Sequence, residues 1–443
     1  MKKKLVAVLM TAAMAVSLAA CGNAGTTDNT TDNTTGTTDT QTTSEETPAV
    51  PAEEVSENAP SGEVVGDTTV KVWVADAVVD FTKEQITAFQ ADHPEFAGFD
   101  FLVEAVGEGD AAGNMITDVT AGADIYGFAQ DQLARLVAAG ALEEVAPENI
   151  DALSTQNDSG AVAAAKVGNT FYAYPMTSDN GYFLYYDKSV ISDPSTLEGI
   201  VADCEAAGKS IYMDLTGWYQ TAFFFGTGCT MTYDSDDSGN FTAANVDYDS
   251  DKGLVALKEM IELASSSAFQ PGSSAGDAVN YAAIIDGTWD AATVKAFLGD
   301  NYACAKLPTF TGSDGNTYQM SGFGGFKLLG VKPQTDADKL AVCDALALYL
   351  TSEDVQLARY NAVGWGPSNL NAQNSDAVKS DEALSALGQQ LAFTIPQGQY
   401  PGDYWTRAEA LAGDVQASFQ TASDDDLKAA LATFQADLES YAK

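Results

Sequence analysis

The stretch TVKVWV at residues 69–74 decides the fold, because it begins an alternation of strands and helices that continues along the chain. Its β-branched residues, together with Trp73, are typical of a strand. A helix is expected directly afterwards, with Thr82 as its N-cap and Gln85 completing a capping box. The globular part of the protein therefore begins here.

Strand and helix patterns alternate through the rest of the chain, and this alternation predicts an α/β fold with largely parallel sheets. The 443 residues exceed what one hydrophobic core usually supports, so two lobes with a ligand cleft between them are expected. Further strands are expected at 99–103, 124–128, 210–213, 281–285 and 302–306, and later helices at 336–350, 353–362 and 424–441.

The first 66 residues have a different character. Residues 1–20 combine three lysines with a short apolar run, the pattern of an export signal. The following stretch LAAC at 18–21 resembles the lipobox of bacterial lipoproteins, which implies cleavage before Cys21 and a lipid on its sulfur. A free Cys in an ordinary signal peptide is the alternative. Residues 21–66 are acidic, rich in Thr and without aromatic or basic residues, so we expect a disordered tether.

Charge and residue usage exclude several classes of function. A net charge of -42 repels phosphate backbones and anionic lipid headgroups, so no nucleic-acid binding is expected. The one histidine, His93, offers poor support for a catalytic triad, and no metal or cofactor is expected. Four cysteines outside the leader lie among apolar residues, which favours buried free thiols while leaving a disulfide open: Cys204, Cys229, Cys304 and Cys343.

Short motifs then follow in a characteristic order: DIYGFAQD at 124–131, YAYP at 172–175, LYYDK at 184–188, IDGTW at 285–289, KLPTF at 306–310 and GFGGF at 322–326. In this order the chain resembles the extracellular solute-binding proteins of ABC importers, of the maltose-binding-protein type, over nearly all of residues 68–440. The resemblance implies a two-lobed, type II periplasmic-binding-protein-like α/β fold that closes by a hinge around a ligand.

The resemblance also implies lobe boundaries. Crossings between lobes are expected near 177–179, 320–322 and 371–376. Lobe 1 would then contain residues 67–178 and 323–374, and lobe 2 would contain residues 179–322 and 375–443.

Sugars present flat C–H faces and hydroxyl groups, so aromatic rings stack on them while carboxylates and amides accept their protons. The resemblance implies stacking at Trp289, Trp405 and Tyr219, with Trp218 as the rival of Tyr219 and Trp365 at the rim. On the first lobe it implies an aromatic contact and hydroxyl acceptors at Phe128, Gln130, Asp131, Asp76 and Asp179. The alternatives are core packing for the aromatic residues and helix capping for the aspartates.

The chain departs from the family pattern where Ala77 and Gln132 replace basic residues and Ala291 replaces an aromatic one. The departures bear on the identity of the sugar more than on the binding fold. A maltooligosaccharide is the first choice of ligand, and another oligosaccharide is the second. Polyamine capture and a surface glycan-adhesion or sensing lipoprotein are the alternatives. No enzyme activity is expected. The expected partners are importer permease subunits, for a monomer held by its lipid on the extracellular face of the cytoplasmic membrane of a Gram-positive bacterium.

Overall fold

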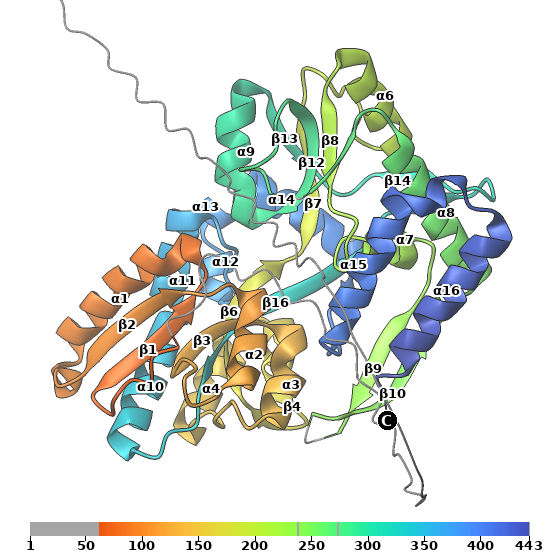
Figure 1. Cartoon of the computed structure of the whole chain (residues 1–443). Helices are drawn as coiled ribbons and strands as arrows, with labels where there is room; N and C mark the ends of the chain where they lie inside the picture. Colours follow the sequence, from red (N-terminus) through yellow and green to blue (C-terminus); the bar gives the residue numbers. More distant parts are fainter. Residues whose placement is uncertain (1–61, 237–238, 273, 443) are drawn as a thin grey trace, which may run out of the picture. The chain divides into compact units, whose positions relative to one another are not determined.

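The computed structural model describes residues 62–442, apart from 237–238 and 273 (Figure 1). Cys21 and the expected tether up to residue 61 lie outside the described residues, whereas residues 62–66 are described and the Gly66 carbonyl accepts from the Thr69 amide at 3.1 Å. The helices are α1 (Val79–Asp92), α2 (Glu108–Thr117), α3 (Leu133–Ala138), α4 (Ile150–Gln156), α5 (Ser159–Ala164), α6 (Leu197–Ala207), α7 (Thr221–Gly226), α8 (Asp251–Ser265), α9 (Ala291–Leu298), α10 (Ala337–Leu350), α11 (Glu353–Val363), α12 (Leu370–Gln373), α13 (Asp376–Lys379), α14 (Glu382–Gln390), α15 (Asp403–Gln416) and α16 (Asp424–Glu439).

The first sheet contains the strands β1 (Thr69–Val74), β2 (Asp100–Ala105), β3 (Ile125–Ala129), β6 (Ala173–Asn180), β16 (Phe323–Val331) and β17 (Ile395–Pro396). Its order is β17-β16-β3-β1-β2, with β6 also pairing with β16. β1 runs parallel to β2 on one side and to β3 on the other. The chain passes from β1 to β2 on one side and then crosses to β3 on the other side of β1. Ligands bind at such a switch point, beyond the carboxyl ends of the strands.

The second sheet has the order β11-β8-β12-β7-β13. β8 is parallel to β11 and β12, whereas β7 is antiparallel to β12 and β13. The chain enters this sheet at Gly181, which separates β6 from β7. Its strands are β7 (Tyr182–Asp187), β8 (Ser210–Met213), β11 (Phe269–Pro271), β12 (Tyr281–Gly287) and β13 (Tyr302–Ala305). Three hairpins complete the described strands: β4 (Lys166–Val167) with β5 (Thr170–Phe171), β9 (Met231–Ser235) with β10 (Phe241–Val246), and β14 (Thr309–Thr311) with β15 (Thr317–Gln319).

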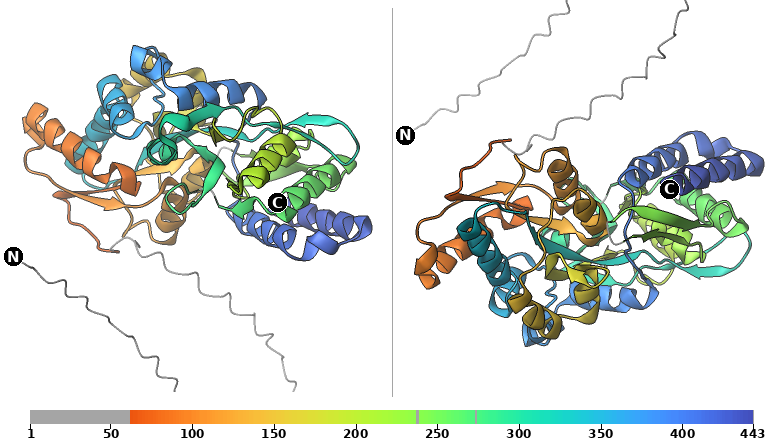
Figure 2. Two further views of the ribbon diagram at one scale, coloured as in Figure 1. Left: turned by 90° about the horizontal axis from the view of Figure 1, so that it is seen from above. Right: turned by 90° about the horizontal axis from the view of Figure 1, so that it is seen from below.

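Each sheet has its own hydrophobic core. Val72, Ile125 and Leu328 of the first sheet are buried with Phe89 of α1 and Leu346 of α10. The second sheet is covered on both faces, by α6, α7, α8, α15 and α16 on one and by α9 and α14 on the other. Both views in Figure 2 place α1, in orange, and α16, in blue, at opposite ends of the described residues. The two-lobed α/β expectation is confirmed, while the exact lobe boundaries stay a prediction.

Most expected strands and helices are present within one or two residues, but the N-cap prediction was wrong. α1 begins at Val79, so Thr82 lies inside it and its hydroxyl donates to the Val78 carbonyl at 2.7 Å. The short turn Asp76–Val78 before α1 carries the chain into the helix without a side-chain cap.

The four cysteines at 204, 229, 304 and 343 are free thiols, three of them buried and Cys304 half-buried. Across the described residues, the helices are all too short or too polar to span a bilayer.

Candidate functional site

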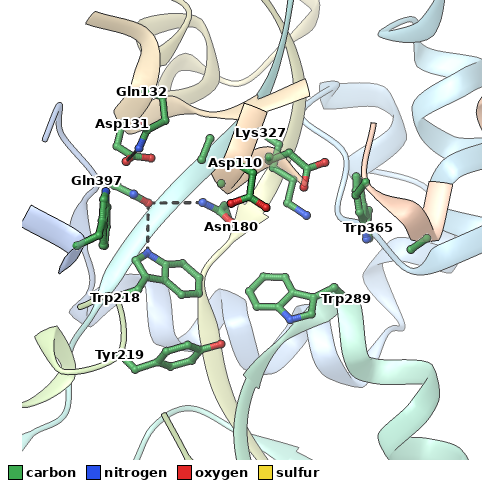
Figure 3. A pocket seen from close by; sticks show the side chains of 16 residues that line it. Asp110, Asp131, Gln132, Asn180, Trp218, Tyr219, Trp289, Lys327, Trp365 and Gln397 are labelled. Atoms are coloured by element: carbon green, nitrogen blue, oxygen red, sulfur yellow. Dashed lines mark hydrogen bonds between the residues drawn. The ribbon is translucent and has the colours of Figure 1, made fainter. Parts of the chain in front are cut away.

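A cavity of about 670 Å³ lies where the carboxyl ends of parallel strands from both sheets meet (Figure 3). Ala75 follows β1, Asp131 follows β3, Trp218 and Tyr219 come after β8, and Trp289 follows β12. The position agrees with the switch point of the first sheet. The remaining lining residues are Ala77, Glu108, Gly109, Asp110, Ala129, Gln132, Asn180, Lys327, Trp365, Gln397 and Trp405.

Aromatic rings dominate the side of the cavity that belongs to the second sheet. The ring centroids of Trp218 and Trp289 are 5.7 Å apart at an interplanar angle of 38°, and Tyr219 meets Trp218 edge-on at 5.3 Å. Trp405, at the start of α15, packs on Tyr404 with its centroid 4.7 Å away. Four of the five tryptophans in the chain line this one cavity, which core packing alone does not explain.

The Trp289 ring rests on the backbone of Gly287. A Cβ atom at position 287 would come within 2.0 Å of that ring, so only glycine permits this placement. Behind the ring, the buried Asp286 accepts hydrogen bonds from the Gly287 amide at 2.7 Å and the Tyr219 hydroxyl at 3.4 Å. Burial is the main cause that raises the pKa of Asp286 well above its usual value. The IDGTW motif therefore holds the rings of Trp289 and Tyr219 in place.

Gln397 connects the two sides of the cavity. Its side-chain oxygen accepts from Trp218 Nε1 at 3.3 Å and from Asn180 Nδ2 at 3.5 Å (Figure 3). Its backbone carbonyl accepts from the Gln130 side chain. Gln399 continues the connection, since its side chain donates to the Gln130 carbonyl at 2.8 Å and accepts from the Ala134 amide at 2.7 Å.

Asp131 is an unusual acid in the cavity wall. Its side chain is 1% exposed, and burial raises its pKa to about 7, although its backbone hydrogen bond, the Gln132 amide and Arg135 oppose the shift. Gln132 donates to the Asp131 carboxylate and in turn accepts from Arg135 at 2.6 Å. The carboxyl group is thus held in place by a chain of hydrogen bonds and titrates near neutral pH.

Lys327, on β16, supplies a cation in the same cavity. Its ammonium lies 3.6 Å from the ring centroid of Trp365 and 5.4 Å from that of Trp289, both cation–π contacts. Within the described residues this ammonium makes no hydrogen bond or ion pair. Trp365 Nε1 and Glu108 Oε1 are buried and also lack hydrogen-bond partners there. The Lys327 ammonium is therefore left for a polar ligand, whereas the other two atoms are unpaired but enclosed.

Six of the ten predicted ligand residues line the cavity: Trp289, Trp405, Tyr219, Trp218, Asp131 and Trp365. Trp365 is only 2% exposed, and Lys327 covers one face of its ring, so that face does not offer a stacking platform.

The structure does not bring Phe128, Asp76, Asp179 and Gln130 to the cavity surface. Phe128 points into the first core because alternate residues of a strand face opposite sides, and its neighbour Ala129 faces the cavity instead. Asp76 is exposed between the two lining residues Ala75 and Ala77.

The buried Asp179 is used structurally. It accepts from the Thr288 hydroxyl and from the Gly366 amide, each at 2.6 Å, and so connects three segments next to the chain crossing. Gln130, also buried, donates to the Gln397 backbone as described above.

Sequence reasoning missed Lys327, Gln397, Asn180, Glu108 and Asp110. Lys327 carried a signal, since a lysine inside the otherwise apolar run FGGFKLLGV calls for a specific role. The other four lie in loops or at element ends, where polar residues are ordinary.

The arrangement suits binding of a polar molecule with flat apolar faces. Aromatic rings lie on one side and carboxylate, amide and ammonium groups on the other. Among the described residues, no cluster of three or more histidine, cysteine or acidic side chains is placed to hold a metal ion.

One curated relative is a galactooligosaccharide-binding protein of Bacillus subtilis (strain 168), 25% identical over 318 residues, which cover 65% of this chain and 71% of that protein. A solved structure of a complex with acarbose matches with a TM-score of 0.74 at 25% identity, covering 85% of this chain and 99% of that one. A maltodextrin-binding protein from L. casei BL23, solved without ligand, matches with a TM-score of 0.67 at 24% identity, covering 84% and 98%.

These neighbours share the two-lobed architecture described above. The family model of bacterial extracellular solute-binding proteins matches residues 84–386, which is more than half of the chain. The chain therefore belongs to the bacterial extracellular solute-binding proteins.

Proposed function

We propose that this protein captures an oligosaccharide in the aromatic cavity by hinge closure and delivers it to an ABC importer. The observation that carries the proposal is the gathering of Trp218, Tyr219, Trp289 and Trp405 opposite polar groups. Such rings offer faces for the C–H surfaces of sugars, and the carboxylates, amides and Lys327 suit sugar hydroxyls. No covalent step is part of the proposal.

The volume of the cavity is sufficient for a small oligosaccharide. At about 670 Å³ it lies within the range of roughly 300–1,000 Å³ that is usual for clefts that enclose small molecules. A maltooligosaccharide remains our first choice, supported by the maltodextrin- and acarbose-binding structural neighbours. The curated relative makes a galactooligosaccharide the second choice.

Polyamine capture at this site loses support from Lys327. A polyamine would have to share the cavity with an ammonium that has no carboxylate partner within the described residues. Like charges enclosed together repel each other strongly when water is excluded. We therefore expect spermidine not to compete with sugar, and raising the ionic strength to leave sugar binding nearly unchanged.

Intrinsic fluorescence tests the proposal directly, because four of the five tryptophans line the cavity. The chain is titrated with malto-, galacto-, xylo- and manno-oligosaccharides of two to four units and with spermidine, and a thermal-shift assay runs in parallel. A fluorescence change and a raised melting temperature with one sugar class support the proposal. A response to none of the sugars would refute it.

Lipid attachment at Cys21, followed by a tether, is part of the same proposal. A tethered receptor keeps its captured solute at a high local concentration beside the permease. Mass spectrometry of the protein purified from its host membrane tests this, since a diacylated N-terminal cysteine is expected. A chain starting at another residue would argue for a freely secreted protein.

A further inference from the structure

A second cavity, of about 190 Å³, opens between α6 and α8 and shares no lining residue with the first. Figure 1 shows both helices in the part of the protein built around the second sheet. Leu197 and Val201 of α6 and Leu263 of α8 give it apolar walls. The ionisable side chains that line it are all glutamates, so an apolar cavity contains acidic groups and no basic group.

Glu259 of α8 is the group that points to an occupant. Its side chain is 4% exposed and lines the cavity, yet within the described residues it makes no hydrogen bond or ion pair. The neighbouring Lys258 does not neutralise it, because its ammonium is paired with Asp424 at 2.6 Å. Most of this side chain is enclosed, while its carboxyl oxygens are not among the fully enclosed unpaired atoms and remain reachable. The enclosure disfavours the charged form unless a ligand supplies a positive charge.

The neighbouring glutamates disfavour the charged form of Glu259 further. Glu198 and Glu205 of α6 and Glu262 of α8 line the same cavity. Glu198 accepts from the Thr311 amide at 2.6 Å, and Glu205 accepts from the hydroxyls of Ser266 and Ser267 at 2.9 and 3.0 Å. Burial first, then Glu262 and Glu198, raises the pKa of Glu259 to about 8. The empty cavity therefore keeps a proton on this carboxyl at neutral pH.

The shape of the cavity favours an organic cation over a metal ion. As noted above, the described acidic groups are not arranged to hold a metal. At roughly 30 Å³ for each water molecule, the cavity has room for about six non-hydrogen atoms, the size of a short alkylamine. We propose that the cavity between α6 and α8 is a binding site for a primary alkylammonium group, with its ammonium on Glu259 and its alkyl chain against Leu197, Val201 and Leu263.

Such a group has two possible sources, a free alkylamine or the lysine side chain of another protein. Calorimetric titrations with n-pentylamine, cadaverine and Nα-acetyl-lysine amide distinguish them, with 1-pentanol as the neutral control. If the source is a lysine side chain, the acetyl-lysine amide binds at least as tightly as pentylamine. If it is a free amine, pentylamine or cadaverine binds more tightly than the amide.

Glu259→Gln removes the charge while keeping the shape, and the exposed Glu409→Gln is the control for loss of one negative charge elsewhere. Amine affinity should fall at least tenfold in Glu259→Gln and stay unchanged in Glu409→Gln. Trp289→Ala locates the amine, because binding in the aromatic cavity would be weakened by this change and binding between α6 and α8 would not.

Proton release gives a readout that needs no variant. Because an ammonium favours the ionised carboxylate, binding at pH 7 should release close to one proton, seen as a heat that depends on the ionisation enthalpy of the buffer. This measurement decides the matter if Glu259→Gln does not fold. The proposal is overturned if no amine binds at millimolar concentration, if Glu259→Gln binds like the wild type, or if Trp289→Ala abolishes the binding. Sugar binding in the aromatic cavity does not depend on any of these three outcomes, so the two proposals can fail separately.

Discussion

The Lys327 ammonium lies 3.6 Å from the ring centroid of Trp365, while its other contact, with Trp289, is at 5.4 Å. The lysine is 6% exposed, on a strand that is otherwise apolar. Two indole rings thus hold a cation at the cavity wall, and no acidic side chain among residues 62–442 that the structure describes pairs with it. This relationship makes Trp365, which was expected at the rim, a support for the charge, and it leaves the ammonium hydrogens for a ligand.

Lys327→Met should weaken oligosaccharide binding about tenfold to a hundredfold, because a charge-assisted hydrogen bond contributes roughly 1.5–3 kcal/mol. Tryptophan fluorescence titration measures the affinity for the oligosaccharide. Lys428→Met, on the exposed face of α16, is the matched control and should bind like the wild type. Equal affinity in both variants would mean that Lys327 only packs on Trp365.

Trp289→Ala and Trp405→Ala should each reduce affinity by more than tenfold with little change in the melting temperature, since both rings are only half-buried. Calorimetry gives the affinity and a thermal melt gives the stability. Trp73→Phe is the contrasting variant, because Trp73 is 2% exposed and its indole donates to Glu104 at 2.8 Å. That change should lower the melting temperature and leave the affinity intact.

Gly287→Ala should weaken sugar binding without touching the ligand. The added methyl group would lie 2.0 Å from an atom of the Trp289 ring, so the ring has to move. Affinity and the fluorescence spectrum of the free protein should both change. Gly388→Ala on α14, where an added Cβ meets no atom within 4 Å, serves as the control and should alter neither.

Sugar affinity should rise with pH through the titration of Asp131, whose pKa is raised to about 7 by burial. A hydroxyl donates better to the carboxylate than to the acid, so affinity should increase about tenfold between about pH 6 and about pH 8. Asp131→Asn should flatten the profile. A wild-type profile that is flat as well would show that Asp131 does not accept from the ligand.

The raised pKa of Asp131 also determines how the stability of the folded chain changes with pH. The pKa of Asp131 is higher in the folded chain than its usual value of 3.8, so the unfolded chain holds fewer protons at intermediate pH. Stability should therefore fall as pH rises from about 4 to about 7 and then level off with respect to this group. Urea unfolding of the wild type and of Asp131→Asn across this pH range checks the prediction. The free energy of unfolding should fall less with rising pH in the variant.

The sequence was sufficient for the α/β fold and for most of the aromatic wall. Strand and helix periodicity depends on the local spacing of apolar residues, which can be read without tertiary contacts. Trp289, Trp218 and Tyr219 follow strand ends in motifs that mark such turns, so their arrival in a cavity was predictable. The prediction of Thr82 as the N-cap was wrong because a capping-box pattern locates the start of a helix only to within a few residues.

Apart from Asp131, which the sequence predicted, the tertiary structure decided the polar side of the cavity. Lys327, Gln397 and Asn180 come from segments far apart in the sequence, and only the pairing of β16 with β3 and β6 brings Lys327 beside them. Which face of β3 met the cavity was likewise a matter of register, which buried Phe128 and exposed Ala129 to the ligand space. Residue spacing determines which elements form, whereas packing between distant elements determines which side chains converge.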